Sequence, residues 1–356
     1  MSLTLSHFSG PDLSLRVMLS LKLFFDERIR LATPYGPQYQ ALWEAARQAS
    51  DGGKKIRPAL LIGTYQELGG DDTENAVQAA TAFELLHTAF LLHDDVIDRD
   101  LIRRGRPNLI GAFASGAADR GVGSADAQLW GQASAILAGD LLIHSAQMMV
   151  ASLAIPEARR AAMLDLLDRC VFVTAAGEHA DVAFSSQVES PELPAVLAMT
   201  EHKTACYSFE GPLKAAAILA DSGGFVLRTL GEFGRRVGIA FQLRDDLLGV
   251  FGDEAATGKS STSDLREGKV TALLAYARLS IHQRELNELL ARPQLTDADH
   301  AHLRSLVEQS GARSFVEKLI ADHTEQALTL LESVDLPGNL RLRLRQVARD
   351  AAQRSV

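Results

Sequence analysis

The chain has few cysteines and no long uninterrupted apolar run, and each shortage excludes a class of protein. Only two cysteines, Cys170 and Cys206, occur in 356 residues. That is too few for a disulfide framework and fits free thiols in a reducing cytoplasm. No apolar run reaches about 18 residues, so we expect no membrane-spanning helix. The first residues lack a basic segment followed by an apolar one, so we expect no secretory signal peptide.

Positive charge is in the minority. The chain has 36 Lys and Arg against 45 Asp and Glu, which gives a formal net charge of −9. Proteins that bind nucleic acids are usually basic, so we expect no nucleic acid among the partners. This balance still allows local basic pockets for small anions.

Strand signals are scarce, whereas helical signals run through almost the whole chain. Leu and Ala dominate, and there are only 11 prolines to interrupt them. The periodicity predicts an all-α protein. The expected helices cover residues 12–31, 37–49, 56–68, 73–98, 130–152, 157–184, 192–219, 225–252, 269–291, 297–308, 311–333 and 337–353.

Two segments lack the helical pattern. Gly111–Gln132 is rich in Gly, Ala, Ser and Asp and predicts a loop, and Gly252–Lys269 predicts a second one. The sequence shows no repeat and no linker between domains. We therefore expect a single domain over residues 1–356, with a core that carries the motifs at about 50–275 and C-terminal helices over 276–356.

An apolar segment from Ala82 to Leu92 ends in a cluster of carboxylates. Asp94 and Asp98 are four residues apart, so a helix places them on one face, with Asp95 beside them. Carboxylates this close repel one another unless a cation neutralises them. They fit the oxygen ligands of Mg²⁺, although an acidic helix end exposed to water would give the same pattern.

A second acidic pair lies about 150 residues downstream in another apolar segment. Asp245 and Asp246 follow Gln242 there, and all three lie near one face of the expected helix. Two apolar helices with paired aspartates predict two walls of one cavity that holds several metal ions. The position four residues after Asp245 is Gly249, so the second motif has no third carboxylate at that place.

Basic residues accompany these acidic motifs. Lys54 and Arg57 are three residues apart at an expected helix start, where backbone N–H groups help to bind an anion. Arg103 and Arg104 follow the first acidic motif. Each such residue alone is more often a solvated surface charge, and their association with the acidic motifs is what favours a site. Further basic residues of this kind are Lys203, Lys259 and Lys269.

Several short motifs occur in a fixed order between Gly52 and Thr271. They are GGKKIRP, FELLHTAFLLHDDVID, RRGRP, AILAGD, EHKT, FQLRDD, GK and LREGKVT. As a set they resemble the trans-isoprenyl diphosphate synthases, also called polyprenyl synthetases. The resemblance implies an isoprenoid synthase-type bundle of antiparallel helices around a deep central cavity, several Mg²⁺ ions and a homodimer. It implies a reaction that joins isopentenyl diphosphate to an allylic diphosphate (dimethylallyl, geranyl or farnesyl).

The resemblance also assigns roles by matching position, and the family's second motif commonly has a third aspartate where this chain has Gly249. The metal-binding positions match Asp94, Asp95, Asp98, Asp245 and Asp246. The catalytic positions match Asp94, Asp95, Asp98, Lys203, Asp245 and Lys259. The isopentenyl diphosphate site matches Lys54, Arg57, His87 and Arg104. The contacts of the allylic diphosphate match Arg103, Lys203, Thr204, Gln242, Lys259 and Lys269.

Product length is read from the helix before the first aspartate. In the resembling family the residues four and five before that aspartate often limit the growing chain. Here they are Phe90 and Ala89, with Leu86 on the same stripe one turn earlier. One large and one small residue give a mixed signal, and no extra residues lengthen the DDVID motif. We therefore expect a short product, C20 geranylgeranyl diphosphate. C15 farnesyl diphosphate or a longer product is the alternative.

Other classes of protein stay open. A class I terpene cyclase shares the fold and one acidic motif, but it needs no isopentenyl diphosphate site. A non-catalytic regulatory subunit of a prenyl synthase also shares the fold, and Gly249 keeps this class open although the DDVID motif is complete. A helical scaffold or binding protein leaves two acidic clusters in apolar segments unexplained.

Overall fold

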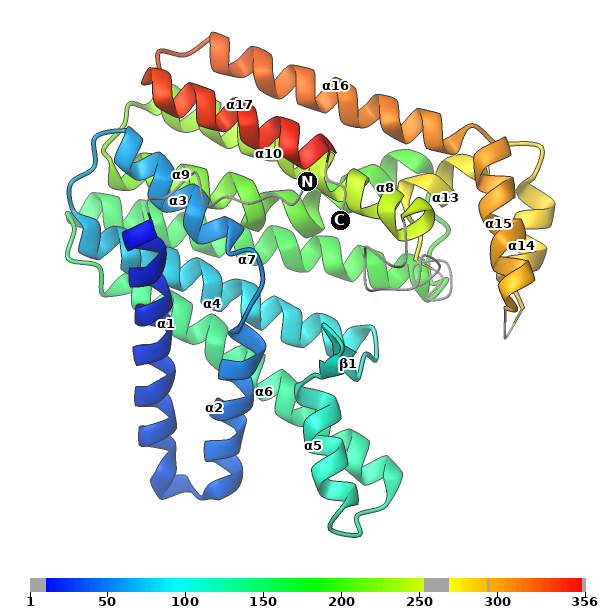
Figure 1. Ribbon diagram of the computed structural model, residues 1–356, viewed down its shortest axis with the longest axis horizontal. Coiled ribbons are helices and arrows are strands. Elements are labelled where there is room, and N and C mark those ends of the chain that lie inside the picture. Colours follow the sequence, from blue (N-terminus) through cyan, green and yellow to red (C-terminus); the bar gives the residue numbers. More distant parts are fainter. Residues whose placement is uncertain (1–10, 253–268, 293–294, 354–356) are drawn as a thin grey trace. The chain divides into compact units, whose positions relative to one another are not determined.

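The computed structural model describes residues 11–252, 269–292 and 295–353. Helices make up most of the described chain, and its two strands, of two residues each, form one hairpin (Figure 1). The prediction of an all-α protein is therefore confirmed. The chain divides into two compact units. We call them the N-terminal unit (described residues 11–167 and 215–222) and the C-terminal unit (described residues 168–214 and 223–353). The expectation of one domain over the whole chain stays a prediction.

The N-terminal unit contains the first helices and the hairpin. Its elements are α1 (Pro11–Ala32), the 3₁₀ helix η2 (Thr33–Tyr35), α2 (Pro37–Ser50), α3 (Ile56–Glu67), α4 (Thr73–Ile97), β1 (Ile102–Arg103), β2 (Arg106–Pro107), α5 (Leu109–Ala118) and α6 (Ser124–Ala151). In Figure 1, α1 and α2 form an antiparallel pair joined by a short turn. The two helices that continue from one unit into the other are α7 (Glu157–Ser185) and α9 (Gly211–Leu219).

Helix α4 carries the core of the N-terminal unit. The Asp72 side chain caps its first turn by accepting a hydrogen bond from the Asn75 backbone N–H at 3.1 Å. Its middle is buried almost all round, and Phe83 is 1% exposed. It packs most extensively against α6. Small buried residues such as Ala138 and Gly139 on α6 let the two helices approach closely.

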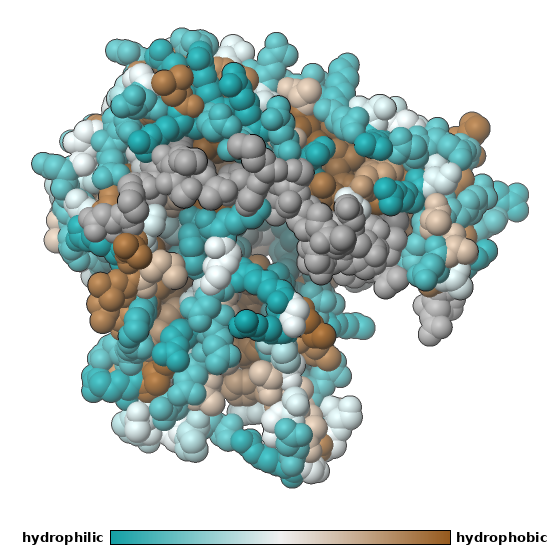
Figure 2. Space-filling model, viewed as in Figure 1, coloured by the Kyte–Doolittle hydropathy of each residue, from teal (hydrophilic) through white to brown (hydrophobic). Residues whose placement is uncertain are grey.

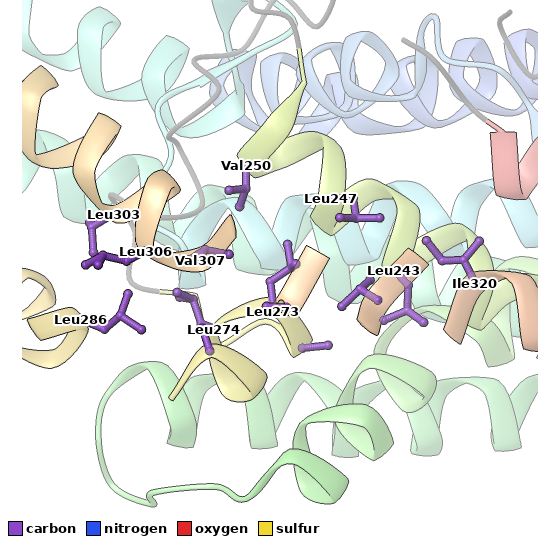
Figure 3. Close-up of a cluster of buried hydrophobic side chains, with 14 of the residues drawn as sticks. Leu243, Leu247, Val250, Leu273, Leu274, Leu286, Leu303, Leu306, Val307 and Ile320 are labelled. Atoms are coloured by element: carbon purple, nitrogen blue, oxygen red, sulfur yellow. The ribbon is translucent and has the colours of Figure 1, made fainter. Parts of the chain in front are cut away.

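The remaining helices build the C-terminal unit. They are α8 (Leu193–Thr200), the π-helix η3 (Glu201–Glu210), α10 (Gly224–Phe251), α13 (Ala272–Ala277), α14 (Gln283–Leu290), α15 (Asp297–Gln309), α16 (Ala312–Glu332) and α17 (Gly338–Gln353). Buried aliphatic side chains from α10, α13, α14, α15 and α16 form its core, as Figure 3 shows. Helix α10 also packs along α16 and α17. This packing holds the helix of the second acidic motif in place.

The structure corrects the loop predicted over Gly111–Gln132. The segment forms most of α5 and the start of α6. The Asn108 side chain begins α5 by accepting a hydrogen bond from the Gly111 N–H at 2.9 Å, and alanine favours the helix that follows. The Phe113 and Trp130 rings, 5.7 Å apart between centroids, join the two helices. The other predicted loop, Gly252–Lys269, lies outside the described residues except at its two ends.

One described helix, α6, is long and apolar enough to cross a membrane by length and composition. Only 44% of its most apolar window is buried. A core helix of a folded domain meets the same criterion, so the expectation of no membrane span stays a prediction. Hydrophilic residues cover much of the face drawn in Figure 2, with separate hydrophobic patches between them.

Candidate active site

The carboxylates at the end of α4 lie where the helix itself disfavours them. Asp94 and Asp95 belong to its last turn, and Asp98 is the C-cap, whose N–H donates to the Asp94 carbonyl at 2.8 Å. The C-terminal end of a helix carries partial negative charge and repels carboxylates. A cation beside this end therefore stabilises it.

Arg103 supplies that positive charge from the hairpin after α4. Its Nε donates to Asp95 Oδ1 at 2.7 Å, and its Nη2 lies 2.6 Å from the same oxygen and 3.1 Å from Asp94 Oδ2. Burial raises the pKa of Asp95 to about 6, although Arg103 acts in the opposite direction. Asp94 and Asp98 are only partly buried. Their carboxylates are therefore the more accessible ones of this motif.

The turn of the hairpin brings a second arginine to the basic loop between α2 and α3. Arg104 and Gly105 form this turn with φ of 54° and 72°, the positive values that a type I′ turn requires. Arg104 Nη1 donates to the Asp51 carbonyl at 2.5 Å. A Cβ on Gly53 would lie 3.0 Å from Arg104 Nη2, so the guanidinium rests against the loop. Lys54 is exposed on the same loop.

Several cations converge on His87 of α4. Burial, followed by the charges of Arg57, Lys55, Arg104 and Arg103, holds the pKa of His87 well below its ordinary value. Arg57 lies in the first turn of α3, where the helix N-terminus also favours anions. An anion among these groups would relieve their mutual repulsion. Three residues predicted to bind isopentenyl diphosphate are thus close to one another.

In the C-terminal unit, three predicted residues form one chain of hydrogen bonds. The Thr204 hydroxyl donates to Gln242 Oε1 at 2.8 Å, and Gln242 Nε2 donates to Asp246 Oδ1 at 2.9 Å. Asp246 is buried, whereas Asp245 is exposed. Asp245 is therefore the accessible carboxylate of the second motif. Gly249, one turn later, adds no side chain to it.

The segment with Lys203 is the π-helix η3, whereas the sequence pattern predicts one continuous helix over 192–219. Glycines on neighbouring helices make room for its backbone. A Cβ on Gly177 of α7 would lie 2.3 Å from the Lys203 backbone nitrogen, and one on Gly238 of α10 would lie 2.6 Å from Ala205 Cα. π-Helical segments are frequent at functional sites.

Two carboxylates that we did not predict from the sequence hold the Lys203 ammonium group. Lys203 Nζ donates to Glu178 Oε1 at 3.1 Å and to Asp181 Oδ2 at 2.7 Å. Both acids lie on α7, and their three-residue spacing, which places them on one face of a helix, was the available signal. These contacts fix the direction of the lysine side chain.

The predicted residues not yet placed are two lysines and the three chain-length residues. Lys259 lies outside the described residues, and Lys269 is partly buried just before α13. Leu86 and Ala89, two of the predicted chain-length residues, are fully buried at 0% exposure. Phe90 is partly exposed one turn before the first acidic motif.

The oxygen donors of both motifs fit Mg²⁺. This ion typically takes one or two carboxylates and completes its octahedron with water and substrate phosphates. Asp94, Asp98 and Asp245 offer accessible carboxylates of that kind. In the described part of the chain, no group of three or more His, Cys, Asp or Glu side chains is arranged so that it could hold a metal ion by itself. Any ion held by these carboxylates would therefore need further ligands from water or from a bound anion.

The carboxylates at the C-terminal end of α4 favour cations, and the cations around His87 favour an anion. Together they suit an enzyme that binds anionic substrates in an all-helical fold. The polyprenyl synthetase family matches residues 40–309, well over half of the chain. The chain therefore belongs to the polyprenyl synthetase family. It is a trans-prenyltransferase of the isoprenyl diphosphate synthase type.

Relatives of known activity match most of the chain. A geranylfarnesyl diphosphate synthase from Aeropyrum pernix is 32% identical over 289 residues, 80% of this chain and 84% of that protein. A geranylgeranyl diphosphate synthase from Methanosarcina mazei is 31% identical over 295 residues, 82% of this chain and 84% of that protein. The crystal structure of geranylgeranyl pyrophosphate synthase from Corynebacterium glutamicum, complexed with isoprenyl diphosphate and magnesium, matches with a TM-score of 0.89 and 28% identity over 97% of this chain and 99% of that one. These names differ in product length, so family membership leaves it open.

We expect the free energy of unfolding to fall as the pH drops below about 6.5, the ordinary histidine pKa in the unfolded chain. Because the pKa of His87 is lowered in the folded protein, the unfolded state takes up the proton first. Stability is then lost as the pH falls from about 6.5 toward the folded pKa, by at most about 1.4 kcal/mol per pH unit. Urea unfolding at about pH 5.5 and 7.5 measures this for the wild type and His87→Gln. The variant should lose less stability on acidification, and equal losses would contradict the assignment.

Proposed function

We propose that this protein condenses isopentenyl diphosphate with an allylic diphosphate, releases inorganic diphosphate and forms a short trans-polyprenyl diphosphate. The observation that carries the proposal is a cluster of carboxylates beside Arg103 and a separate cluster of cations around His87, both in the N-terminal unit. A reaction with two diphosphate substrates uses both sites. A terpene cyclase binds one diphosphate and has no use for the second. The names of the relatives support these substrates.

In this proposal Lys54, Arg57, His87 and Arg104 bind the isopentenyl diphosphate. The crowding of cations around His87 favours an anion of high charge. Arginine presents planar pairs of N–H groups that match phosphate oxygens. His87, whose pKa is low, takes part as a neutral ring that can donate one hydrogen bond.

The allylic diphosphate is the proposed ligand of both acidic motifs. When bound, Mg²⁺ would neutralise the charge that grows on the leaving diphosphate. The residues that would hold the ions are Asp94, Asp95, Asp98, Asp245 and Asp246. The proposed direct contacts of the diphosphate are Arg103, Lys203, Thr204, Gln242, Lys259 and Lys269. The hydrogen bonds of Lys203 and Thr204 with their neighbours orient two of these groups in advance.

The reaction breaks the bond between the allylic C1 and its diphosphate oxygen. Arg103 and Lys203 stabilise the leaving group as its negative charge grows. The alkene of isopentenyl diphosphate then forms a carbon–carbon bond to the allylic cation. A proton leaves the new cation, and the released diphosphate is the proposed base. Apolar surroundings keep water away from the cations.

A second candidate function is that of a non-catalytic regulatory subunit, and Gly249 is the observation that favours it. Asp246 is already engaged by Gln242, so the second motif offers Asp245 with no third carboxylate. The complete first motif, with its Arg103 contacts, supports a catalytic chain.

We also propose a homodimer that forms through α6. Large apolar side chains with 39–62% exposure line this helix, at spacings that place them on one side: Leu129, Trp130, Ile136, Leu137 and Met148. Exposed apolar side chains on one side of a helix fit an interaction site. A second copy of the same chain can cover it about a two-fold axis, because such an interface uses the same patch twice.

The cytoplasm is the proposed location. Both cysteines, Cys170 and Cys206, are buried free thiols. Free thiols are typical of proteins in reducing compartments.

Leu137→Glu should lower the dimer fraction, because it places a charge in the centre of the proposed interface. Light scattering after size-exclusion chromatography measures the mass at several protein concentrations. The control is Leu279→Glu, which changes a 70% exposed leucine outside α6. An unchanged mass for Leu137→Glu would contradict the proposed interface.

Asp94→Asn should lower kcat/KM at least a hundredfold, because losing about 2.8 kcal/mol of transition-state stabilisation has that effect. Diphosphate release with isopentenyl diphosphate, an allylic diphosphate and Mg²⁺ measures it. Asp71→Asn is the control, since Asp71 is exposed just before α4. Near-normal turnover in Asp94→Asn would remove the first motif from the mechanism. A wild-type protein without turnover would favour the regulatory subunit.

The proposed product is C20 geranylgeranyl diphosphate, with the tail running along α4 away from the aspartates. One helical turn rises about 5.4 Å, comparable to one isoprene unit. Phe90→Ala should therefore lengthen the product and Ala89→Phe should shorten it, as chromatography of the dephosphorylated products would measure. Because Ala89 is fully buried, a melting curve must show that Ala89→Phe is folded. Parental products from both variants would mean that another helix limits the chain.

A further inference from the structure

A buried ion pair lies beside the residues proposed to bind isopentenyl diphosphate and is not one of them. Lys55 Nζ donates to Glu84 Oε1 at 2.8 Å and to the Ser50 carbonyl at 2.5 Å. The Glu84 side chain is 5% exposed, and that of Lys55 is 18% exposed. Ser50 ends α2, and Glu84 lies on α4 three residues before His87. The pair therefore joins α2 and α4 to the loop that begins α3.

This loop has a backbone that needs external support. Gly52, Gly53 and Lys55 have φ of 75°, 73° and 48°. The last value is uncommon for a residue with a Cβ, and such a conformation persists only where its surroundings impose it. Arg104 fixes one side of the loop through the Asp51 carbonyl. The ion pair fixes the other side, next to the first turn of α3.

The adjacent lysines Lys54 and Lys55 differ in burial, and we infer that they differ in role. Lys54 is exposed, whereas the Lys55 ammonium points inward to a carboxylate. The second oxygen of Glu84, Oε2, is buried and accepts no hydrogen bond. A buried carboxylate in this state depends on its one cationic partner. Lys55 is therefore committed to the protein and does not extend toward a substrate.

We propose that Lys55 and Glu84 are positioning residues for isopentenyl diphosphate alone. They hold the loop so that Lys54 and the N-terminus of α3, with Arg57, face one diphosphate near His87. The identity of that substrate rests on the proposed function. The hydrogen bonds of the pair do not extend to the carboxylates of the first acidic motif, so we expect the pair to leave the binding of the allylic substrate unchanged.

Steady-state kinetics with each substrate varied in turn tests this division. Lys55→Met keeps an unbranched side chain that is one atom shorter and removes its charge and both hydrogen bonds. We expect the KM for isopentenyl diphosphate to rise at least about tenfold, and kcat and the allylic KM to stay within about twofold. Lys55→Arg keeps a cation for Glu84 and should restore most of the affinity. Equal rises in both KM values would overturn the proposal.

A double variant tests whether the ion pair positions the loop or whether Lys55 only neutralises the buried charge of Glu84. Lys55→Met/Glu84→Leu replaces the ion pair by apolar side chains, a change that usually preserves stability. We expect its melting temperature to return toward that of the wild type while the KM for isopentenyl diphosphate stays raised. Recovery of the wild-type KM would overturn the proposal, because it would show that the pair only avoids a buried unpaired charge.

Calorimetric titration with inorganic diphosphate, without metal ions, gives a readout that is independent of turnover. Lys55→Met should bind diphosphate at least about tenfold more weakly than the wild type. Unchanged diphosphate affinity would overturn the inference even in an active enzyme. A wild-type protein that binds diphosphate but transfers no prenyl group would instead contradict the proposed function and leave the ion pair's role supported.

Discussion

The negative end of α4 is the constraint on which the rest of the site depends. Asp94, Asp95, Asp98 and Asp100 add like charges to a helix terminus that is already negative. Such an end is favourable only with cations beside it. The hairpin after α4 meets part of this need by placing Arg103 against two of the carboxylates. Asp94 and Asp98 stay only partly buried, so further cations can approach the terminus.

Two turns earlier on the same helix, the like charges that repel one another are positive. Around His87 the protein gathers cations, and burial, followed by the charges of these cations, lowers the pKa of that ring. This contrast matches the different fates of the two proposed substrates. A diphosphate that must leave benefits from metal ions that neutralise its growing charge. A diphosphate that stays attached needs only to be held, and fixed side-chain cations such as Arg57 and Arg104 suffice for that.

The sequence was enough to predict the all-α class and most of the helices, because helices leave a local pattern, whereas the roles of the site residues stay predictions. Leu/Ala periodicity marks the helices, and the four-residue spacing of Asp94 and Asp98 marks their shared face. The loop predicted over Gly111–Gln132 was wrong because small residues fit either a loop or a close-packed helix, and packing decides between them. The inward direction of Lys55 could not be predicted, since it depends on Glu84, which lies 29 residues away along the chain.

The π-helix η3 is also hard to predict from local sequence, because it depends on residues of other helices. A wider backbone turn fits only where Gly177 and Gly238, on two other helices, have no Cβ to obstruct it. Two side chains of η3 form hydrogen bonds with those two helices. Lys203 joins it to α7 through Asp181, and Thr204 joins it to α10 through Gln242. The π-helical backbone is hard to predict from the segment itself. The same backbone lets the adjacent residues Lys203 and Thr204 form hydrogen bonds with two different helices.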